Sequence, residues 1–470
     1  MGKNSGIGLP LGLVLFFVVS TTIFRGTSSE TFLPFSKKKS TQPTAANNPF
    51  DSSVLFKVIG NVYPLGYYAA LVNIGNPPKT YDFDFDTGSD LSWVQCDAPC
   101  TSCTLPRTKQ YRPNHNAMPC SNRLCQAINL PTRNCHDAND QCDYELKYAD
   151  GGSSTGVLVM DSFPLPLING TVIRPALAFG CGYHQEIPFG AHPSPTTAGV
   201  LGLGKGETSF VSQLRALNIT KNVIGHCLSS QGGGFLFLGD HFVPSKGTSW
   251  APMLHSTENY YVSGPADLLF GGKPTGASGL QLTIDSGSSY TYFSSQVYKT
   301  TLNLIQKDLS GKPLKDAPED KTLPICWKGR KPFKSINDAK SYFQPLALSF
   351  KNAKNVQLLL PPEHYLIVSK NGNVCFGILN GTEKGLGNLN LIGDIFLQDK
   401  LVIYDNERQL IGWAPANCNT LPNVGRDYNE GFCQPYAANF GIIEDHCPAA
   451  TVYEKPRQLI EIKRNSPNNK

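Results

Sequence analysis

The chain has 470 residues, of which 40% are hydrophobic and 16% are charged. This composition is that of a globular protein with a large core, and it excludes a chain that is disordered throughout; the length predicts two or three domains. The formal net charge of +5 is small for this length, and no Lys/Arg stripe interleaved with aromatic residues is present. We therefore expect no nucleic-acid partner.

The N-terminus has the pattern of a secretory signal peptide. Lys3 precedes an apolar stretch at 7–24, and Arg25 and small polar residues follow it. We expect residues 1–30 to be the signal; an uncleaved signal anchor is less favoured, because Pro10 and several Gly, Ser and Thr residues dilute the run. The chain is expected in the secretory pathway, in the apoplast or the vacuole, with no membrane span after signal removal.

Short alternating segments dominate the chain after a polar leader. Residues 31–53 are rich in Ser, Thr, Lys, Pro and Asn, which predicts a flexible leader or a pro-segment. From Val54, apolar alternation in runs such as GYYAALVNIG and TYDFDFD, separated by Gly, Pro and Asn turns, predicts an all-β fold. Helical spacing predicts a few helices, within SFVSQLRALN, SSQVYKTTLNLIQKDL and a stretch at 336–343.

Fourteen cysteines behind a signal pattern indicate disulfide bonds in an oxidising compartment. Seven of them lie between Cys96 and Cys142, where the connectivity stays open and the spacing lacks the second ligand pair of a zinc site, so no metal is expected. Cys326 and Cys375 are predicted to pair, because few other cysteines lie near them. Candidate glycosylation sites on surface loops are Asn169, Asn218 and Asn380.

Two triplets, Asp86-Thr87-Gly88 and Asp285-Ser286-Gly287, occupy similar contexts, FDFDTGSDLSW and LQLTIDSGSSYTYF. Each Asp follows an alternating apolar run, and the Gly allows a tight turn, so each carboxylate is expected at the lip of a sheet. The segments AGVLGLG and NLNLIGDIFL also recur at similar distances after each triplet. A duplicated lobe explains both coincidences.

The repeat therefore predicts two lobes that build one site. We expect the first lobe at 54–245, with a Cys-rich insertion at 96–142, the second lobe at 246–418, and an irregular polar tail at 419–470.

Two facing carboxylates repel each other, so ionising both costs free energy. The pair would therefore share one proton. The ionised member would take a proton from a water molecule, and the protonated member would polarise a carbonyl group, which predicts an acidic optimum. Ser89 and Ser288, each three residues after its Asp, are expected to orient the carboxylates; the alternative is that both only stabilise the turn.

The two triplets, the segments YADGGSSTG and AGVLGLG, and LIGDIFLQDKLVIYDNERQLIGWAP occur in the order found in the pepsin-like aspartic proteases, which the chain resembles from about Val54 to Cys418. It is most similar to the plant nucellin-like and nepenthesin-like branch, which carries a long Cys-rich insertion. The resemblance implies a bilobal fold with an interlobe cleft and Asp86 and Asp285 as the catalytic pair. Residues expected to support this dyad are Thr87, Gly88, Ser89, Ser286, Gly287 and Ser288.

The same resemblance implies a flap over the substrate. Tyr148, which opens YADGGSSTG, resembles the flap tyrosine, and Trp93 resembles the tryptophan that supports it. Ala149 and Asp150 are expected in the same substrate-binding flap. Ala149 stands where the family usually has Gly, and Gly152 is an extra residue in the Asp-Gly-Ser segment; both departures concern subsite preference more than activity.

We therefore expect a secreted, monomeric aspartic endopeptidase that cleaves extended polypeptides without a cofactor. The alternative is a non-catalytic binding or inhibitor-like protein on the same scaffold. Such proteins usually lose an Asp or its triplet, and both triplets are intact here. A carbohydrate-acting enzyme is disfavoured, because the paired acids of glycosidases lie in unlike environments.

Overall fold

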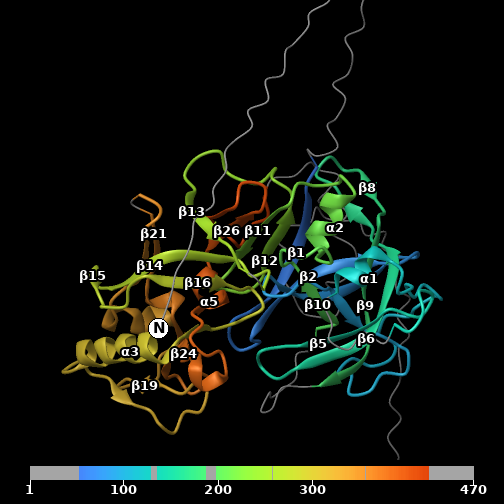
Figure 1. Ribbon diagram of the computed structural model, residues 1–470. Coiled ribbons are helices and arrows are strands. Elements are labelled where there is room, and N and C mark those ends of the chain that lie inside the picture. Colours follow the sequence, from blue (N-terminus) through green and yellow to red (C-terminus); the bar gives the residue numbers. More distant parts are fainter. Residues whose placement is uncertain (1–51, 129–134, 187–196, 257, 355, 423–470) are drawn as a thin grey trace, which may run out of the picture. The chain divides into compact units, whose positions relative to one another are not determined.

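A computed structural model describes residues 52–128, 135–186, 197–256, 258–354 and 356–422 (Figure 1). Within these ranges strands predominate and helices are few and short, so the all-β prediction is confirmed. The predicted signal peptide, nearly all of the leader and most of the tail lie outside the described residues. Among the described residues, no helix combines the length and the apolar character that are needed to cross a bilayer.

The range expected for the N-terminal lobe contains the elements from β1 to β12. In chain order these are β1 (Val54–Asn61), β2 (Tyr67–Ile74), β3 (Lys79–Asp86), β4 (Trp93–Gln95), α1 (Arg123–Ala127), β5 (Asp143–Lys147), β6 (Ser153–Ser162), β7 (Leu165–Pro166), β8 (Val172–Ile173), β9 (Ala176–Glu186), β10 (Gly199–Gly202), α2 (Phe210–Ala216), β11 (Val223–Leu228) and β12 (Gly234–Leu238).

The range expected for the C-terminal lobe contains the elements from β13 to β27. These are β13 (Ser249–Leu254), β14 (Val262–Phe270), β15 (Lys273–Pro274), β16 (Leu280–Ile284), β17 (Thr291–Phe293), α3 (Ser295–Leu309), β18 (Lys315–Asp316), β19 (Cys326–Lys328), α4 (Ile336–Ala339), η2 (Lys340–Tyr342), β20 (Leu346–Phe350), β21 (Gln357–Leu360), η3 (Pro362–His364), β22 (Leu366–Val368), β23 (Val374–Phe376), β24 (Ile378–Asn380), η4 (Thr382–Lys384), β25 (Leu391–Ile392), α5 (Asp394–Leu397), β26 (Lys400–Asp405) and β27 (Leu410–Pro415).

The three predicted helical segments contain α2, α3 and the pair α4 and η2. In α3 the spacing of four residues places Val297, Thr301 and Ile305 on one buried face. At the start of α2, the side chain of Ser209 accepts the Ser212 N–H at 3.3 Å and caps the helix. Local signals therefore account for where these helices form.

Most strands of the described residues belong to one 21-stranded sheet. Antiparallel pairing of β11 with β26 connects the strands of the two lobes, and both labels lie side by side in Figure 1. Each lobe contains parallel strand pairs, among them β3 with β10 and β16 with β25. These two parallel pairs carry the two triplets.

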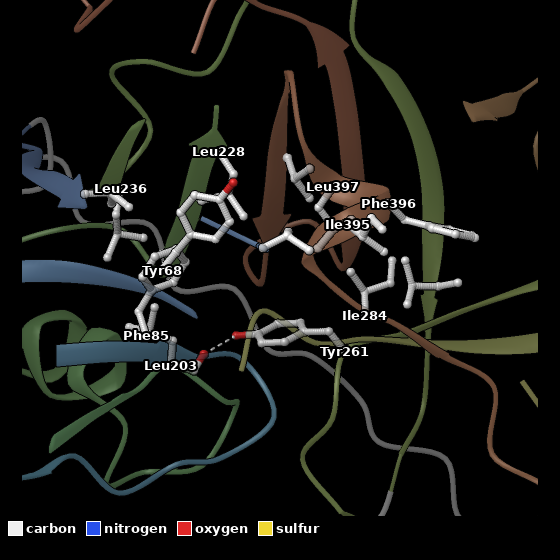
Figure 2. Close-up of a cluster of buried hydrophobic side chains, with 14 of the residues drawn as sticks. Tyr68, Phe85, Leu203, Leu228, Leu236, Tyr261, Ile284, Ile395, Phe396 and Leu397 are labelled. Atoms are coloured by element: carbon white, nitrogen blue, oxygen red, sulfur yellow. Dashed lines mark hydrogen bonds between the residues drawn. The ribbon is translucent and has the colours of Figure 1, made fainter. Parts of the chain in front are cut away.

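A single buried cluster extends from one lobe to the other beneath the triplets. Figure 2 shows Tyr68, Phe85 and Leu203 of the N-terminal lobe in the same cluster as Tyr261 and Ile284 of the C-terminal lobe. The Tyr261 hydroxyl donates a hydrogen bond to the Leu203 carbonyl at 3.0 Å. The residues that precede the two triplets are thus packed into one continuous apolar core.

Every cysteine in the described part of the chain is in a disulfide bond. The cluster between Cys96 and Cys142 is not closed on itself, because Cys96 pairs with Cys181 on β9. The bond between Cys227 and Cys418 ties β11 to the segment after β27. The six pairs are Cys96–Cys181, Cys100–Cys103, Cys120–Cys135, Cys125–Cys142, Cys227–Cys418 and the expected Cys326–Cys375.

The three sequons differ in their exposure. Asn169 and Asn218 are exposed, as a glycan acceptor must be. Asn380 is only 7% exposed at the end of β24, where its Oδ1 accepts the Ser295 hydroxyl at 2.9 Å. The expected surface position is wrong for Asn380, because its side chain is enclosed by packing at the start of α3.

Candidate active site

The two Asp-Ser/Thr-Gly loops begin where two strands end. Asp86 is the last residue of β3, and Asp285 directly follows β16. In β3, strand alternation buries Tyr81, Phe83 and Phe85 in the core and turns the intervening aspartates to the other face. The sequence pattern therefore places an Asp at the open end of each strand.

Each loop is closely approached by a glycine of a second segment. Because β10 runs parallel to β3, Gly202 lies opposite Asp86. A Cβ atom on Gly202 would collide with the backbone of Asp90, and one on Gly393 would collide with the backbone of Tyr290. This close approach explains why a Leu/Ile-Gly pair recurs in both halves of the sequence.

Four hydrogen bonds join the two triplets reciprocally. The Ser286 N–H donates to Thr87 Oγ1 at 3.0 Å, and the Thr87 hydroxyl donates to the Ile284 carbonyl at 3.2 Å. In the mirror arrangement, the Thr87 N–H donates to Ser286 Oγ at 3.2 Å, and the Ser286 hydroxyl donates to the Phe85 carbonyl at 2.8 Å. Both side chains are fully buried, so the network fixes one loop against the other.

The network brings the carboxyl groups of Asp86 and Asp285 together. The Gly88 N–H donates to Asp86 Oδ1 at 2.7 Å, and the Gly287 N–H donates to Asp285 Oδ1 at 3.0 Å. A Cβ atom on Gly88 would lie 2.8 Å from Asp285 Oδ1, and one on Gly287 would collide with Asp86 Oδ1. Each carboxyl group therefore lies over the glycine of the other triplet.

Proximity has an electrostatic consequence for Asp285. Burial, the charge of Asp86 and a hydrogen bond between the two carboxyl groups raise the pKa of Asp285 well above its usual range. Asp86 is 8% exposed and Asp285 is half-buried, so the pair is largely shielded but still reaches solvent. One proton shared between the two groups fits this arrangement.

The two serines that follow the triplets behave differently. The Ser89 hydroxyl donates to Asp86 Oδ2, as expected. The Ser288 hydroxyl instead donates to the Tyr290 carbonyl at 3.4 Å. The expectation that Ser288 orients Asp285 is therefore wrong, because its hydroxyl is used within the turn, which was the alternative left open by the sequence.

The expected flap tyrosine lies close to the pair. The Trp93 Nε1–H donates to Tyr148 Oη at 2.6 Å. Burial and then the charge of Asp86 raise the pKa of the Tyr148 phenol well above its usual range, which indicates that the ring lies near that carboxyl group. Trp93 is thus in contact with Tyr148, as the resemblance implies.

The segment after Tyr148 forms a tight hairpin tip between β5 and β6. The Tyr148 N–H donates to the Gly152 carbonyl at 2.8 Å, and the Gly152 N–H donates to Asp150 Oδ1 at 2.9 Å. Gly151 has a φ of +88°, a conformation that favours glycine. Ala149 and Asp150 are exposed at this tip.

Two further carboxyl groups near the pair were not singled out from the sequence. Asp84 is half-buried on β3, on the same strand face as Asp86. Burial and then the charges of Asp86 and Asp285 raise the pKa of Asp84 well above its usual range. The alternation of TYDFDFD was the signal for this neighbour, since residues two apart share a strand face.

Asp394 opens α5 and is 1% exposed. Its Oδ1 atom is buried without a hydrogen-bond partner among the described residues. Burial, followed by the charges of Asp84, Asp285 and Asp86, raises the pKa of Asp394 well above its usual range. The sequence signal was the repeated Gly motif, in which the second copy has Asp394 where the first has Leu203.

The described residues contain two clusters with metal-ligand chemistry, and both include disulfide-bonded cysteines. They are Cys120, Cys125 and Cys135, and Asp320, Cys326 and Cys375. The sulfur atoms of these cysteines are used in disulfide bonds, which leaves neither cluster with a set of free thiolate ligands.

Two family models match the chain. Residues 68–240 match the model described as "Xylanase inhibitor N-terminal", and residues 268–415 match "Xylanase inhibitor C-terminal". Each match covers one of the two triplets.

Relatives and solved structures share most of the chain. An aspartic proteinase of Oryza sativa subsp. indica is 42% identical over 386 residues, which cover 80% of this chain and 93% of that protein. Aspartic proteinase nepenthesin-1 of Nepenthes gracilis is 26% identical, with 75% of this chain and 78% of that protein covered. The crystal structure of basic 7S globulin from soybean has a TM-score of 0.61 at 17% identity and covers 79% of this chain and 99% of that one. The last likeness concerns the fold alone.

Proposed function

We propose, from the premise that this chain belongs to the plant branch of the pepsin-like aspartic proteases, that it is an endopeptidase that hydrolyses polypeptides at acidic pH. One observation carries the proposal. Asp86 and Asp285 lie over each other's glycines, and four reciprocal hydrogen bonds between Thr87 and Ser286 and the strands behind them hold this arrangement. A binding scaffold has no need of two closely apposed carboxyl groups.

The chemistry assigns different tasks to the two aspartates. Asp285, whose pKa is raised, carries the shared proton, and Asp86, held by Gly88 and Ser89, faces the attacking water molecule. Water adds to the peptide carbonyl carbon while its proton passes to Asp86 and the Asp285 proton passes to the carbonyl oxygen. The resulting gem-diol collapses as Asp86 delivers a proton to the leaving amine and Asp285 recovers its own, so no covalent intermediate forms.

The flap supplies water exclusion and substrate contacts in this mechanism. Tyr148 is held by Trp93 beside Asp86, and the glycines at the hairpin tip allow the segment to close over a bound peptide. An extended peptide between flap and dyad would bind through its backbone, and neighbouring side chains would set the selectivity.

The second candidate is a non-catalytic binding protein, which the names of the matching family models favour, since both name xylanase inhibition. Basic 7S globulin shares the fold. In that case the two carboxyl groups would be structural. The intact triplets and the raised pKa of Asp285 support the endopeptidase instead.

Secretion is part of the proposal. Disulfide bonds throughout the described residues favour an oxidising compartment, and the exposed Asn169 and Asn218 sequons are accessible to glycosylation there. A shift in electrophoretic mobility after glycosidase treatment, absent from a variant that lacks both asparagines, would support this location.

The decisive experiment compares hydrolysis of denatured protein at acidic pH by the purified chain, Asp86→Asn and Asp285→Asn, each with and without a pepstatin-type inhibitor. Both variants should lose about 10³-fold in kcat/KM, because a proton-transfer group is removed. Asp82→Asn, on the same face of β3 but hydrogen-bonded to the Ala198 N–H at 3.3 Å, is the matched control. Wild-type turnover equal to that of Asp86→Asn would reject the endopeptidase in favour of the binding protein.

A further inference from the structure

Asp84 is a carboxyl group beside the dyad that the proposed mechanism does not use. Residues two apart on a strand share a face and lie about 7 Å apart. Asp84 therefore precedes Asp86 by one such step on β3 and is carried on the same face, away from the core. Its half-buried position keeps it in contact with solvent.

The Asp84 carboxylate is distinguished from its strand neighbours by its lack of partners. The Ala198 N–H donates to Asp82 Oδ1 at 3.3 Å, and Gly88 and Ser89 both donate to Asp86. Among the residues that the structure describes, none donates a hydrogen bond to the Asp84 side chain or forms an ion pair with it. A partly desolvated carboxyl group without a donor is costly, unless a ligand supplies one.

The charged surroundings of Asp84 are acidic. The charges that act on it come from Asp86 and Asp285, and Asp84 in turn acts on Asp394 and on the Tyr148 phenol. This places Asp84 in the same neighbourhood as both members of the dyad and the flap tyrosine. A cation brought there would relieve the repulsion between several carboxyl groups at once.

We propose that Asp84 is a specificity-determining residue that binds the ammonium or guanidinium group of a Lys or Arg next to the scissile bond. The inference rests on the proposed function, because it assumes that a peptide lies across the dyad. A substrate strand advances by about 3.4 Å per residue, so the residue adjacent to the bond at the dyad lies within reach of a group one strand step away. Long, flexible basic side chains fit this geometry.

The chemistry favours a cation over a neutral polar side chain. A neutral amide would satisfy one carboxylate oxygen but would leave the repulsion from Asp86 and Asp285 in place. A basic side chain does both, and it favours the ionised form of Asp84 on binding. The substrate class inferred is thus polypeptide with a basic residue adjacent to the cleaved bond.

Two sets of peptides test the inference. The first is a set of internally quenched peptides that differ only in having Lys, norleucine, Gln or Glu at the residue before or after the scissile bond. Wild type should prefer Lys over norleucine about tenfold in kcat/KM at one of the two positions, the effect of one partly exposed ion pair beside the reacting bond. In Asp84→Asn the ratio should fall to within about twofold, and Asp84→Lys should reverse the preference toward Glu.

Asp82→Asn is the matched control and should keep the wild-type ratio, since its carboxylate already has a backbone donor. The second set contains reduced-bond analogues of the same peptides, which cannot be cleaved, and their Kd values are measured by calorimetry. A Lys preference in Kd that disappears in Asp84→Asn supports the inference even if no peptide is cleaved, in which case the proposed function alone fails. Equal Kd values for Lys and norleucine analogues, a preference for Gln equal to that for Lys, or a Lys preference that Asp84→Asn retains would overturn it.

Discussion

The two triplet loops are alike in what joins them and different in what surrounds them. Thr87 and Ser286 make the same pair of hydrogen bonds across the junction, each to the other's loop and to the strand behind it. The first carboxylate has a second donor in Ser89, whereas the Ser288 hydroxyl is used within its own turn. The shared part thus holds the carboxyl groups together, and the unshared part makes them chemically distinct.

The largest effect is expected from filling the space that the two glycines leave for the carboxyl groups. A methyl group from Gly287→Ala would collide with Asp86 Oδ1, and one from Gly88→Ala would lie 2.8 Å from Asp285 Oδ1. Displacing a reacting group by even 1 Å costs about 10²-fold, so both variants should lose at least that much in kcat. Steady-state kinetics on a quenched peptide measures the loss, and circular dichroism checks that the fold is kept. A near-normal kcat in one variant would show that the close approach of a carboxyl group matters for activity only at the other glycine.

Removing either hydroxyl of the reciprocal network, that of Thr87 or that of Ser286, should destabilise the fold by a similar amount. Thr87→Val keeps the shape of the side chain but removes the acceptor of the Ser286 N–H and the donor to the Ile284 carbonyl. A buried donor left without a partner costs about 1–3 kcal/mol, so the free energy of unfolding should fall by roughly 2 kcal/mol. Ser286→Ala should cost a similar amount, which chemical denaturation measures. Thr300→Val, which removes an exposed hydroxyl bonded to Gln296 within α3, is a control expected to be nearly neutral. Clearly unequal losses would mean that the network is not symmetric in energy.

Substitution of Ser89 and of Ser288 should lower the activity by unequal amounts, because only Ser89 donates a hydrogen bond to a carboxyl group of the pair. Ser89→Ala removes a hydrogen bond to a carboxylate, so we expect kcat/KM to fall about tenfold, the equivalent of about 1.4 kcal/mol. Ser288→Ala removes only a bond of 3.4 Å within the turn, so its activity should stay within about twofold of wild type. Steady-state kinetics at the pH optimum compares the two variants. Equal losses of kcat/KM would mean that Ser89 and Ser288 contribute equally, which would contradict the difference in their hydrogen bonds.

The same contrast shows how far sequence patterns reach. Asp86 and Asp285 were predictable because the residues around them repeat and because strand alternation sets where a side chain points. The partner of the Ser288 hydroxyl was not, since the identical spacing of Ser89 and Ser288 does not encode where each turn directs its side chain. Local spacing fixes a position, whereas a hydrogen-bond partner depends on the backbone that surrounds it.

Disulfide bonds between residues far apart in the sequence could not be predicted from local patterns either. The bond from Cys96 to Cys181 joins the residue after β4 to a residue of β9, strands that lie in parallel only after the lobe has folded. Cys227 and Cys418 are likewise brought together by the pairing of β11 with β26 and of β26 with β27. Asn380 has an intact sequon, but α3 packs over it. These features follow from tertiary contacts that neither spacing nor motif records.

The smallest effect concerns Asp394, which stands where the first copy of the motif has Leu203. The folded protein raises the pKa of Asp394 above its value in the unfolded chain, chiefly through burial and then through the charges of Asp84, Asp285 and Asp86. The folded state therefore binds this proton more tightly. The resulting stability is fully present below the unfolded pKa of about 4 and is lost as pH rises through the folded pKa. Asp394→Asn is neutral at every pH, so it should remove this loss of stability. Thermal melts from pH 4 to pH 7 should show wild type losing more stability than the variant across that range. Parallel curves would mean that Asp394 titrates as it does in the unfolded chain, and that this departure from the first lobe has no electrostatic consequence.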